Sequence, residues 1–234
     1  MELFRQLPQA IMELLSTVRR EGSVLLDVGC WDGEFTVEYA RVVGSGLSEV
    51  HGFDFFPAQL ETARRRGVHT QAIDLEIQKF PLADASMDVV VCNQVLEHLK
   101  QIYLPLSEIH RVLKVGGHAV ISVPNLAALH NRLLLLFGKQ PATIRIMGPH
   151  VRGYSYGSFT QFLEHHGLFV CEQIKPVGMY PFPVGMGSAI ARFVPSLCHT
   201  PIWLVRKTSK VAPNWFESMQ GQKEQTTFFG DDRS

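Results

Sequence analysis

Short apolar runs alternate with amphipathic stretches along most of the chain. Runs that are apolar on both faces predict strands at 23–28, 49–54, 68–73, 87–92, 117–123, 168–175 and 200–206. Apolar residues at helical spacing predict helices at 3–20, 34–43, 57–66, 105–114, 126–137, 158–166 and 185–194. Strands that are apolar on both faces and are joined by helices are typical of a parallel sheet with helices on both sides.

Proline and glycine mark several of the predicted boundaries. Pro57 and Pro105 suit the first turn of a helix, where a missing N–H group costs little. Gly116-Gly117 is expected to stop the helix at 105–114. Residues 208–234 are polar and show no periodicity, so we expect a disordered tail after a single domain at 1–207.

Charge and cysteine usage narrow the function classes. Lys plus Arg equals Asp plus Glu, 22 each, so no single-sign field is available and nucleic acid is not an expected partner. The 4 cysteines show no CxxC pair and no Cys/His metal spacing, so no metal is expected and a reducing environment fits.

Location and assembly are only partly constrained by the sequence. The N-terminal residues lack the basic and apolar regions of a signal peptide, which favours a cytoplasmic location. The longest aliphatic run, 133–137, is too short for a transmembrane segment. Peripheral contact with a membrane stays open, and so does the oligomeric state.

The sharpest local signal is a glycine turn between a predicted strand and a predicted helix, in LLDVGCWDGEFT at 25–36. Gly29 permits the tight turn, and Gly33 allows a ligand or a neighbouring backbone to come close. The N–H groups at the start of the following helix then point at the ligand. Such a turn is also common without any ligand.

Polar residues follow the next three predicted strands. Asp54 ends the second strand, Asp74 follows the third and Asn93 follows the fourth. Because the carboxyl ends of parallel strands meet at one edge of the sheet, these side chains are expected to converge on a ligand. A carboxylate at Asp54 can accept both ribose hydroxyls of an adenosine, and one at Asp74 can accept from the adenine amine.

Together these segments resemble the class I S-adenosylmethionine-dependent methyltransferases that carry a type-11 methyltransferase domain. The resemblance covers about residues 20–125 and rests on LLDVGCWDGEFT (25–36), GFDFFPAQLETAR (52–64), AIDLEIQKFPLADASMDVVVCNQVLEHL (72–99) and EIHRVLKVGGHAVISVPN (108–125). It implies an α/β fold, a Rossmann-like three-layer sandwich. Its seven-stranded, mostly parallel sheet would have one antiparallel strand and helices on both faces. The C-terminal half more loosely resembles methyltransferases of glycan or lipid pathways and the MetW-like accessory proteins of methionine biosynthesis.

The resemblance also implies the residues that surround the methionine part of S-adenosylmethionine. Gly29, Cys30 and Gly33 would line it, and Asp27 would brace the turn. Trp31 departs from the family pattern, which usually has a small residue at this position. Its ring is expected to point off the loop or to cover the pocket.

The adenosine part would be held by residues from the next strands. By the same resemblance, Asp54 would bind the ribose and Phe55 would pack on the adenine. Asp74 with Leu75 would recognise the edge of the base, and Asn93 would border the reactive end of the pocket.

The methyl acceptor is expected to be a metabolite, a sugar or a lipid that is methylated on oxygen or carbon. Enzymes acting on base amino groups would carry a Pro-Pro-aromatic signature after the fourth strand, and this chain has Asn93-Gln94-Val95-Leu96 there. A hydroxyl acceptor benefits from a base, for which His98 and His150 are the candidates.

Residues 124–199 are the expected acceptor side, since 25–95 already supply what the cofactor needs. Arg152, Tyr154 and Tyr156 are the candidate acceptor-binding residues there. The leucine-rich segment at 133–137 predicts either an apolar pocket wall or ordinary core.

Two other functions remain open from sequence. A non-catalytic regulatory or accessory protein could keep the fold and the S-adenosylmethionine pocket without turnover. A nicotinamide-dependent dehydrogenase is a distant alternative, because Cys30-Trp31 stand where its phosphate-binding turn needs a second glycine.

Overall fold

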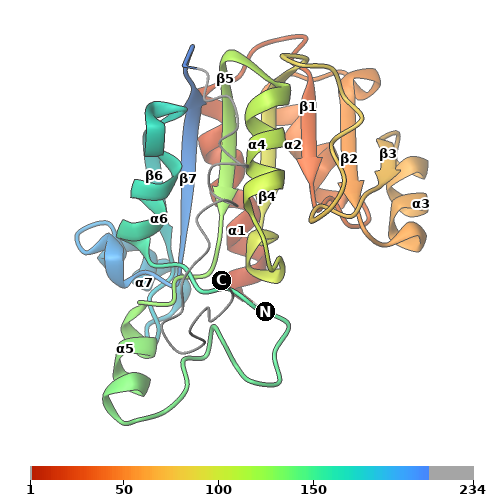
Figure 1. Ribbon diagram of the computed structural model, residues 1–234. Helices are drawn as coiled ribbons and strands as arrows, with labels where there is room; N and C mark the ends of the chain where they lie inside the picture. Colours follow the sequence, from red (N-terminus) through yellow and green to blue (C-terminus); the bar gives the residue numbers. More distant parts are fainter. Residues whose placement is uncertain (1, 211–234) are drawn as a thin grey trace, which may run out of the picture.

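The central feature of the protein is a seven-stranded sheet in the order β3-β2-β1-β4-β5-β7-β6 (Figure 1). The computed structural model describes residues 2–210, with side chains from residue 6 onward. The strands are β1 (Leu25–Val28), β2 (Val50–Asp54), β3 (His69–Ala72), β4 (Met87–Asn93), β5 (Leu113–Ser122), β6 (Phe169–Val177) and β7 (Thr200–Lys207). β7 pairs antiparallel with both β5 and β6, and the remaining pairs are parallel. The expected mostly parallel sheet with one reversed strand is confirmed.

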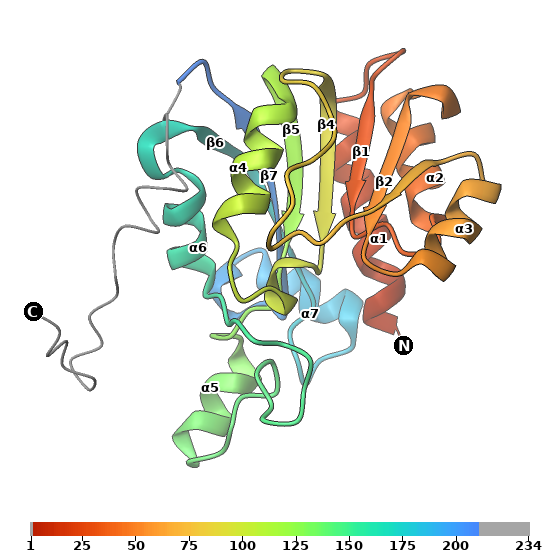
Figure 2. The same ribbon diagram turned by 45° about the vertical axis from the view of Figure 1, so that its right-hand side comes forward.

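Helices cover both faces of this sheet, which confirms the Rossmann-like three-layer arrangement (Figures 1 and 2). The α-helices of the described residues are α1 (Glu2–Thr17), α2 (Glu34–Val43), α3 (Pro57–Arg65), α4 (Tyr103–Val112), α5 (Leu129–Leu136), α6 (Tyr156–Leu163) and α7 (Val184–Ala191). The apolar stripes of α1 and α2 pack on one face, and those of α4 and α6 pack on the other. The tail expected at 208–234 lies outside the described residues from 211 onward.

The apolar pattern explains why these elements form the core. All residues of β1 are buried, as expected for a strand with helices on both sides. In α1, Leu7, Ile11 and Leu15 lie at helical spacing and are buried against the sheet and α2. On the opposite face Trp203 of β7 is fully buried, and its indole N–H donates to the Thr160 hydroxyl of α6 at 2.9 Å.

One predicted boundary is wrong. Gly116-Gly117 does not stop a helix, because α4 ends at Val112 and β5 already begins at Leu113. The pairing of β5 with β4 shifts register between Met87 and Val89, and Gly116 has φ +84 in this irregular part. The glycines therefore serve a bulge in the strand, where a positive φ is needed.

Gly33 fixes the approach of α2 to α3. It has φ +76, and a Cβ atom there would lie 2.8 Å from Cβ and 3.0 Å from Cα of Ala63 in α3. Of the two roles that the sequence allowed, the structure shows the close approach of a neighbouring helix. Gly22 has nearly the same φ, +75, with nothing within 4 Å of the added atom.

This pair of glycines gives a matched test of packing against backbone strain. Gly22→Ala should cost about 1–2 kcal/mol, because only the left-handed conformation is penalised. Gly33→Ala should cost about 2–4 kcal/mol, because the collision with Ala63 is added. Urea unfolding of both variants measures the loss in the free energy of unfolding. Equal losses would show that α3 moves away from the added Cβ atom without a free-energy cost.

Candidate functional site

A cleft of about 660 Å³ opens at the carboxyl ends of β1, β2 and β4, beside the loop after β3. This is the edge where open parallel sheets bind ligands, and the volume suits a cofactor-sized molecule. Its lining residues are Gly29, Trp31, Asp54, Phe55, Phe56, Ile73, Asp74, Leu75, Glu76, Gln94, Val95, His98, Leu99 and Pro149. Of the predicted cofactor residues, the structure therefore brings Gly29, Asp54, Phe55, Asp74 and Leu75 to one cleft.

The turn after β1 is held between β2 and the segment after β4. The backbone N–H groups of Gly29 and Cys30 both donate to the Phe53 carbonyl, at 2.7 and 3.0 Å. Gly29 has φ +81, and a Cβ atom there would lie 2.3 Å from Cγ2 of Val95. A side chain at this position is thus excluded both by the backbone conformation and by space.

Asp54 is oriented by three backbone N–H groups. Its Oδ2 accepts from Trp31 at 2.8 Å, and its Oδ1 accepts from Phe55 at 2.7 Å and Phe56 at 3.2 Å. The side chain is nearly buried, yet it lines the cleft. Because an ionised carboxylate has about four acceptor positions, it keeps capacity for hydroxyl donors of a ligand.

Three exposed aromatic residues stand at the cleft. Trp31, Phe55 and Phe56 are 51%, 63% and 52% exposed. The ring of Phe56 lies edge-on to both others, with centroids 5.5 Å from Trp31 and 5.7 Å from Phe55. Trp31 thus lines the pocket, and of the two positions expected from the sequence its ring takes the one at the pocket. Phe56 was missed from sequence, although its place beside Phe55 in GFDFFP was a usable signal.

The loops after β3 and β4 complete the wall. Asp74 is half-buried, and its Oδ1 accepts from the Glu76 backbone at 2.9 Å. Gln94 has φ +56, an uncommon conformation for a non-glycine residue, and its side chain donates to the Ser122 hydroxyl at 3.2 Å. Strained residues of this kind gather at functional sites. Nothing in the local sequence pattern singled out Gln94.

The remaining predicted cofactor residues lie behind the cleft wall rather than on it. Asp27 accepts from the Thr36 hydroxyl at 2.5 Å, and its burial raises the carboxyl pKa to about 7. Cys30 is buried, and burial raises the pKa of its thiol far above the usual value. Asn93 accepts from the Ser122 hydroxyl at 2.6 Å. With Gly33, these residues shape the loops that line the cleft.

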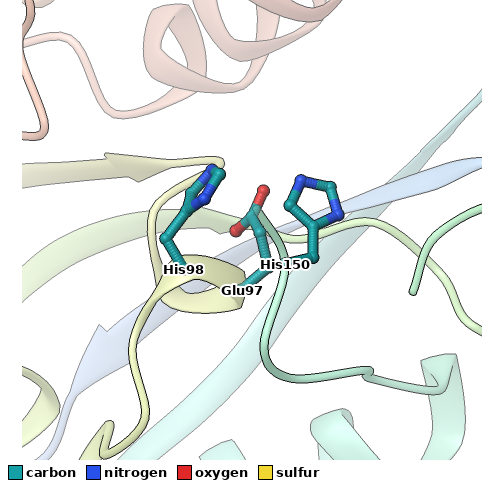
Figure 3. A group of neighbouring side chains, drawn as sticks. All are labelled: Glu97, His98 and His150. Atoms are coloured by element: carbon teal, nitrogen blue, oxygen red, sulfur yellow. The ribbon is translucent and has the colours of Figure 1, made fainter. Parts of the chain in front are cut away.

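Glu97, His98 and His150 converge at one end of the cleft (Figure 3). Val151 and Arg152 donate from their backbone N–H groups to the Glu97 carbonyl, at 2.8 and 3.2 Å, which brings His150 to this turn. The imidazole centroids of His98 and His150 are 4.9 Å apart. Desolvation raises the pKa of Glu97 to about 8. The pKa of His98 is lowered mainly by burial and, to a smaller extent, by the nearby His150.

The three predicted acceptor residues occupy other positions. Arg152 donates from Nε and Nη2 to the Lys100 carbonyl, at 2.9 and 2.5 Å. Tyr154 is buried, and its hydroxyl donates to the Leu96 carbonyl at 2.9 Å. Tyr156 begins α6, with its ring centroid 6.2 Å from that of Trp203. None of the three is among the described residues that line the cleft.

The sequence of this region matches a known family model. Residues 26–121 match the model described as a methyltransferase domain. A demethylmenaquinone methyltransferase from Staphylococcus aureus is 32% identical over 124 residues, which cover 50% of this chain and 51% of the relative. The chain thus spans about half the length, or less, of the curated relatives it matches.

This similarity to the methyltransferase-domain family is confined to residues 26–121, less than half of the chain. S-adenosylmethionine is the cofactor of this domain, and the cleft lies where a Rossmann-like sheet holds one. Outside 26–121, β6 and β7 complete the sheet at one edge, and α1 packs on one of its faces.

Solved structures of low sequence identity share the fold over most of the chain. An S-adenosylmethionine-dependent methyltransferase from Archaeoglobus fulgidus has a TM-score of 0.60 at 18% identity, covering 87% of this chain and 94% of its own. A geranyl diphosphate C-methyltransferase from Streptomyces coelicolor has a TM-score of 0.58 at 16% identity, covering 87% and 82%. Along residues 2–210, no helix combines the length and hydropathy that a bilayer crossing requires.

Asp27 makes the stability of the protein depend on pH. Its folded pKa, about 7, lies above the ordinary carboxyl value of 3.8, so the folded state binds the proton more tightly. Stability therefore falls as the pH rises between these two values, by up to about 1.4 kcal/mol per unit. Asp27→Asn removes this ionisation, so the variant should not lose stability over this range. From pH 5 to pH 8, the free energy of unfolding of the variant should therefore rise by ~2–3 kcal/mol relative to that of the wild type. Urea unfolding at both values measures it, and parallel pH profiles would contradict the assignment.

Proposed function

We propose that the protein transfers the methyl group of S-adenosylmethionine to an oxygen or carbon atom of a small or medium-sized acceptor. The observation that carries this proposal is the single cleft that joins the Gly29 turn, Asp54 and Asp74 to His98. One end of this cleft has the groups for a nucleoside, and the other end has an exposed imidazole. The family match favours this cofactor over a nicotinamide.

The cofactor would lie along the carboxyl edge of the sheet. Asp54 would accept the ribose hydroxyls, with its orientation already set by backbone N–H groups. Phe55 would pack on the adenine, and Asp74 with Leu75 would contact the edge of the base. Gly29 would allow the methionine part to approach the backbone, and the residues behind it, Asp27, Cys30, Gly33 and Asn93, would keep the loops in place.

The acceptor would enter beside His98. Its nucleophilic atom must lie in line behind the methyl group, and orientation of that kind supplies roughly 7–11 kcal/mol. The S–CH3 bond of the cofactor breaks, a bond from the acceptor to the methyl carbon forms, and S-adenosylhomocysteine leaves. We assign loss of the acceptor's proton to the end of the cleft that carries His98 and His150.

Arg152 and Tyr154 would act here as positioning residues. They bind the carbonyls of Lys100 and Leu96, which flank the turn that carries Glu97 and His98. Their contacts support a role in holding that turn rather than direct contact with the acceptor. A role for Tyr156 at the acceptor stays a prediction.

A small-molecule acceptor is supported by two of the similar proteins. One is named for demethylmenaquinone and the other for geranyl diphosphate. The cleft wall of Ile73, Leu75, Val95 and Leu99 is apolar, with few polar groups, as small-molecule sites are. This supports a metabolite, sugar or lipid as the acceptor.

The test of the function is a search for methyl transfer. The purified protein is incubated with methyl-labelled S-adenosylmethionine and with extracts that contain metabolites, sugar conjugates and lipids. Transfer of label to a discrete product supports the proposal. Tight cofactor binding without any transfer would instead support the non-catalytic accessory function.

Asp54 is the most specific test of the cofactor assignment. Asp54→Ala should weaken the binding of S-adenosylhomocysteine at least about tenfold, because charge-assisted hydrogen bonds are worth roughly 1.5–3 kcal/mol each. Isothermal titration calorimetry measures the dissociation constants.

Asp32→Ala is the matched control, since Asp32 lies in the loop after β1 that Asp54 contacts through Trp31, accepts from Glu34 and pairs with Arg66, but does not line the cleft. It should bind the cofactor product with nearly wild-type affinity. Equal affinities for both variants would place the ribose elsewhere.

A further inference from the structure

The ligand atoms of Glu97, His98 and His150 are arranged as a potential metal site. One carboxylate oxygen and one nitrogen from each ring lie within 4.8 Å of one another (Figure 3). Zinc ligands at about 2.0–2.1 Å from the metal are roughly 3.3 Å apart in a tetrahedron. His98 is exposed and His150 is carried by a loop, so small side-chain rotations close the remaining distance.

Both imidazoles are oriented as metal ligands usually are. Nδ1 of His150 lies 2.7 Å from the Thr143 carbonyl, and Nδ1 of His98 lies 3.3 Å from the Pro149 carbonyl. Because a carbonyl only accepts, Nδ1 carries the proton in each ring and Nε2 keeps its lone pair. Metal-bound histidines typically donate their second N–H group in this way.

Glu97 supplies the observation that points to a ligand. Its side chain is 1% exposed, and Oε2 has no hydrogen-bond partner among the described residues. Buried polar side chains are normally hydrogen-bonded, paired with an opposite charge or bound to a metal. The cations Lys100 and Arg152 lie on neighbouring segments, but Arg152 is engaged by a carbonyl and no ion pair to Glu97 forms within residues 2–210.

We propose that Glu97, His98 and His150 bind one divalent transition-metal ion. Two imidazole nitrogens and one carboxylate oxygen suit zinc, iron, cobalt or nickel, whereas magnesium prefers oxygen ligands. Three protein ligands leave at least one position open, as in catalytic zinc sites. His98 lines the cleft, so this open position is placed at its acceptor end.

The metal would act on the acceptor, and this part rests on the proposed function. An acceptor hydroxyl bound at the open position loses its proton more easily, because the metal stabilises the oxygen anion. The O–H bond breaks and its proton passes to water, while the S–CH3 bond breaks and an O–CH3 bond forms. The metal site thus selects acceptors that present a hydroxyl or enol oxygen.

The test measures metal binding without any acceptor. Metal-free protein is titrated with Co²⁺, whose visible absorption reports nitrogen and oxygen ligation, and the bound metal per chain is counted by mass spectrometry. Wild-type protein should bind one ion. Glu97→Gln and His150→Gln should each weaken the binding by at least about tenfold. Excess Mg²⁺ should not displace the cobalt.

His165→Gln is the matched control, because His165 and His166 are an exposed histidine pair outside the site, with ring centroids 4.0 Å apart. It should leave cobalt binding unchanged. Variants are compared only where S-adenosylhomocysteine still binds, which shows that the fold and the cofactor site are intact. The metal site would be overturned if cobalt binding survives both site substitutions, or if the wild type does not bind one ion per chain. The proposed methyl transfer would then still stand, by a route without a metal. Metal binding without any methyl transfer would uphold the site and reject the proposed function.

A second inference comes from α5 and the loop that follows it, which extend away from the sheet (Figure 2). The sequence predicted a pocket wall or core at 133–137. The segment is mostly exposed rather than core, and Leu133, Leu134 and Phe137 line a groove. Leu136 and Phe137 are 76% and 74% exposed, and Ile146 and Met147 in the loop are 91% and 98% exposed. Exposed apolar residues gathered in this way mark an interaction surface.

The charge of this surface is one-sided. The chain has no Asp or Glu between Glu108 and Glu164, and none between Glu172 and Glu217. Exposed basic residues accompany the apolar ones: Arg132, Lys139 and Arg145. A groove of about 540 Å³ joins α5 to Lys139, Arg145 and Tyr180, so these segments form one continuous face.

The geometry points to an anionic lipid bilayer as the occupant of this α5 face, defined by α5, residues 137–147 and Tyr180. Apolar side chains beside arginine and lysine match the acyl region and the negative head groups of such a membrane. The loop reaches the cleft at Pro149, so docking would bring the acceptor end close to the bilayer.

Sedimentation with vesicles tests this surface. The full chain should bind vesicles that contain phosphatidylglycerol and bind pure phosphatidylcholine weakly. Lys139→Glu with Arg145→Glu should reduce binding at least about tenfold, since each basic residue contributes about fivefold. Phe137→Ser should reduce it as well. Val115→Ser is the control, because Val115 is an apolar residue that is also exposed, at 64%, but lies near the start of β5, at the other end of the strand from α5. The proposal would be overturned if the chain binds both kinds of vesicle equally well. It would also be overturned if the chain self-associates and these substitutions abolish the self-association.

Discussion

Hydrogen bonds between the loop after β1 and the end of β2 hold the cleft at the carboxyl edge of the sheet in shape. Gly29 and Cys30 donate to the Phe53 carbonyl, and Asp54 accepts from Trp31. These contacts occur where the sheet ladder ends and the backbone groups need other partners. Since a Cβ atom at Gly29 would collide with Val95, the same turn also sets the distance to the segment after β4. The depth of the cleft follows from these few contacts.

The site concentrates features that reduce stability. Asp27 and Glu97 are buried carboxyl groups whose pKa values burial raises, to about 7 and about 8. Trp31 and Gln94 have positive φ at the same edge of the sheet. The wide apolar core on both faces offsets these costs, as is common where strain serves a binding site.

The second half of the chain contributes in two ways. β6 and β7 complete the sheet, with Trp203 buried beneath α6. The segment between β5 and α6 joins this core at Val123 and Tyr154. Its helix α5 exposes most of its leucines, while the loop after it returns to the cleft through the bonds of Val151 and Arg152 to Glu97. The same segment thus places His150 and leaves an apolar, basic surface.

Local pattern in the sequence determined the strands, the covering helices and the polar residues at the strand ends, because periodicity and glycine turns act over a few residues. That Gly29, Asp54, Asp74 and Leu75 meet at one edge of the sheet could therefore be predicted. Tertiary structure alone decided that Cys30 and Gly33 face neighbouring helices and strands, that Tyr154 is buried, and that α5 is exposed. It also brought His150 to Glu97 and His98 through a loop whose path no local pattern specifies, because contacts between residues far apart in the chain depend on the packing of the intervening elements.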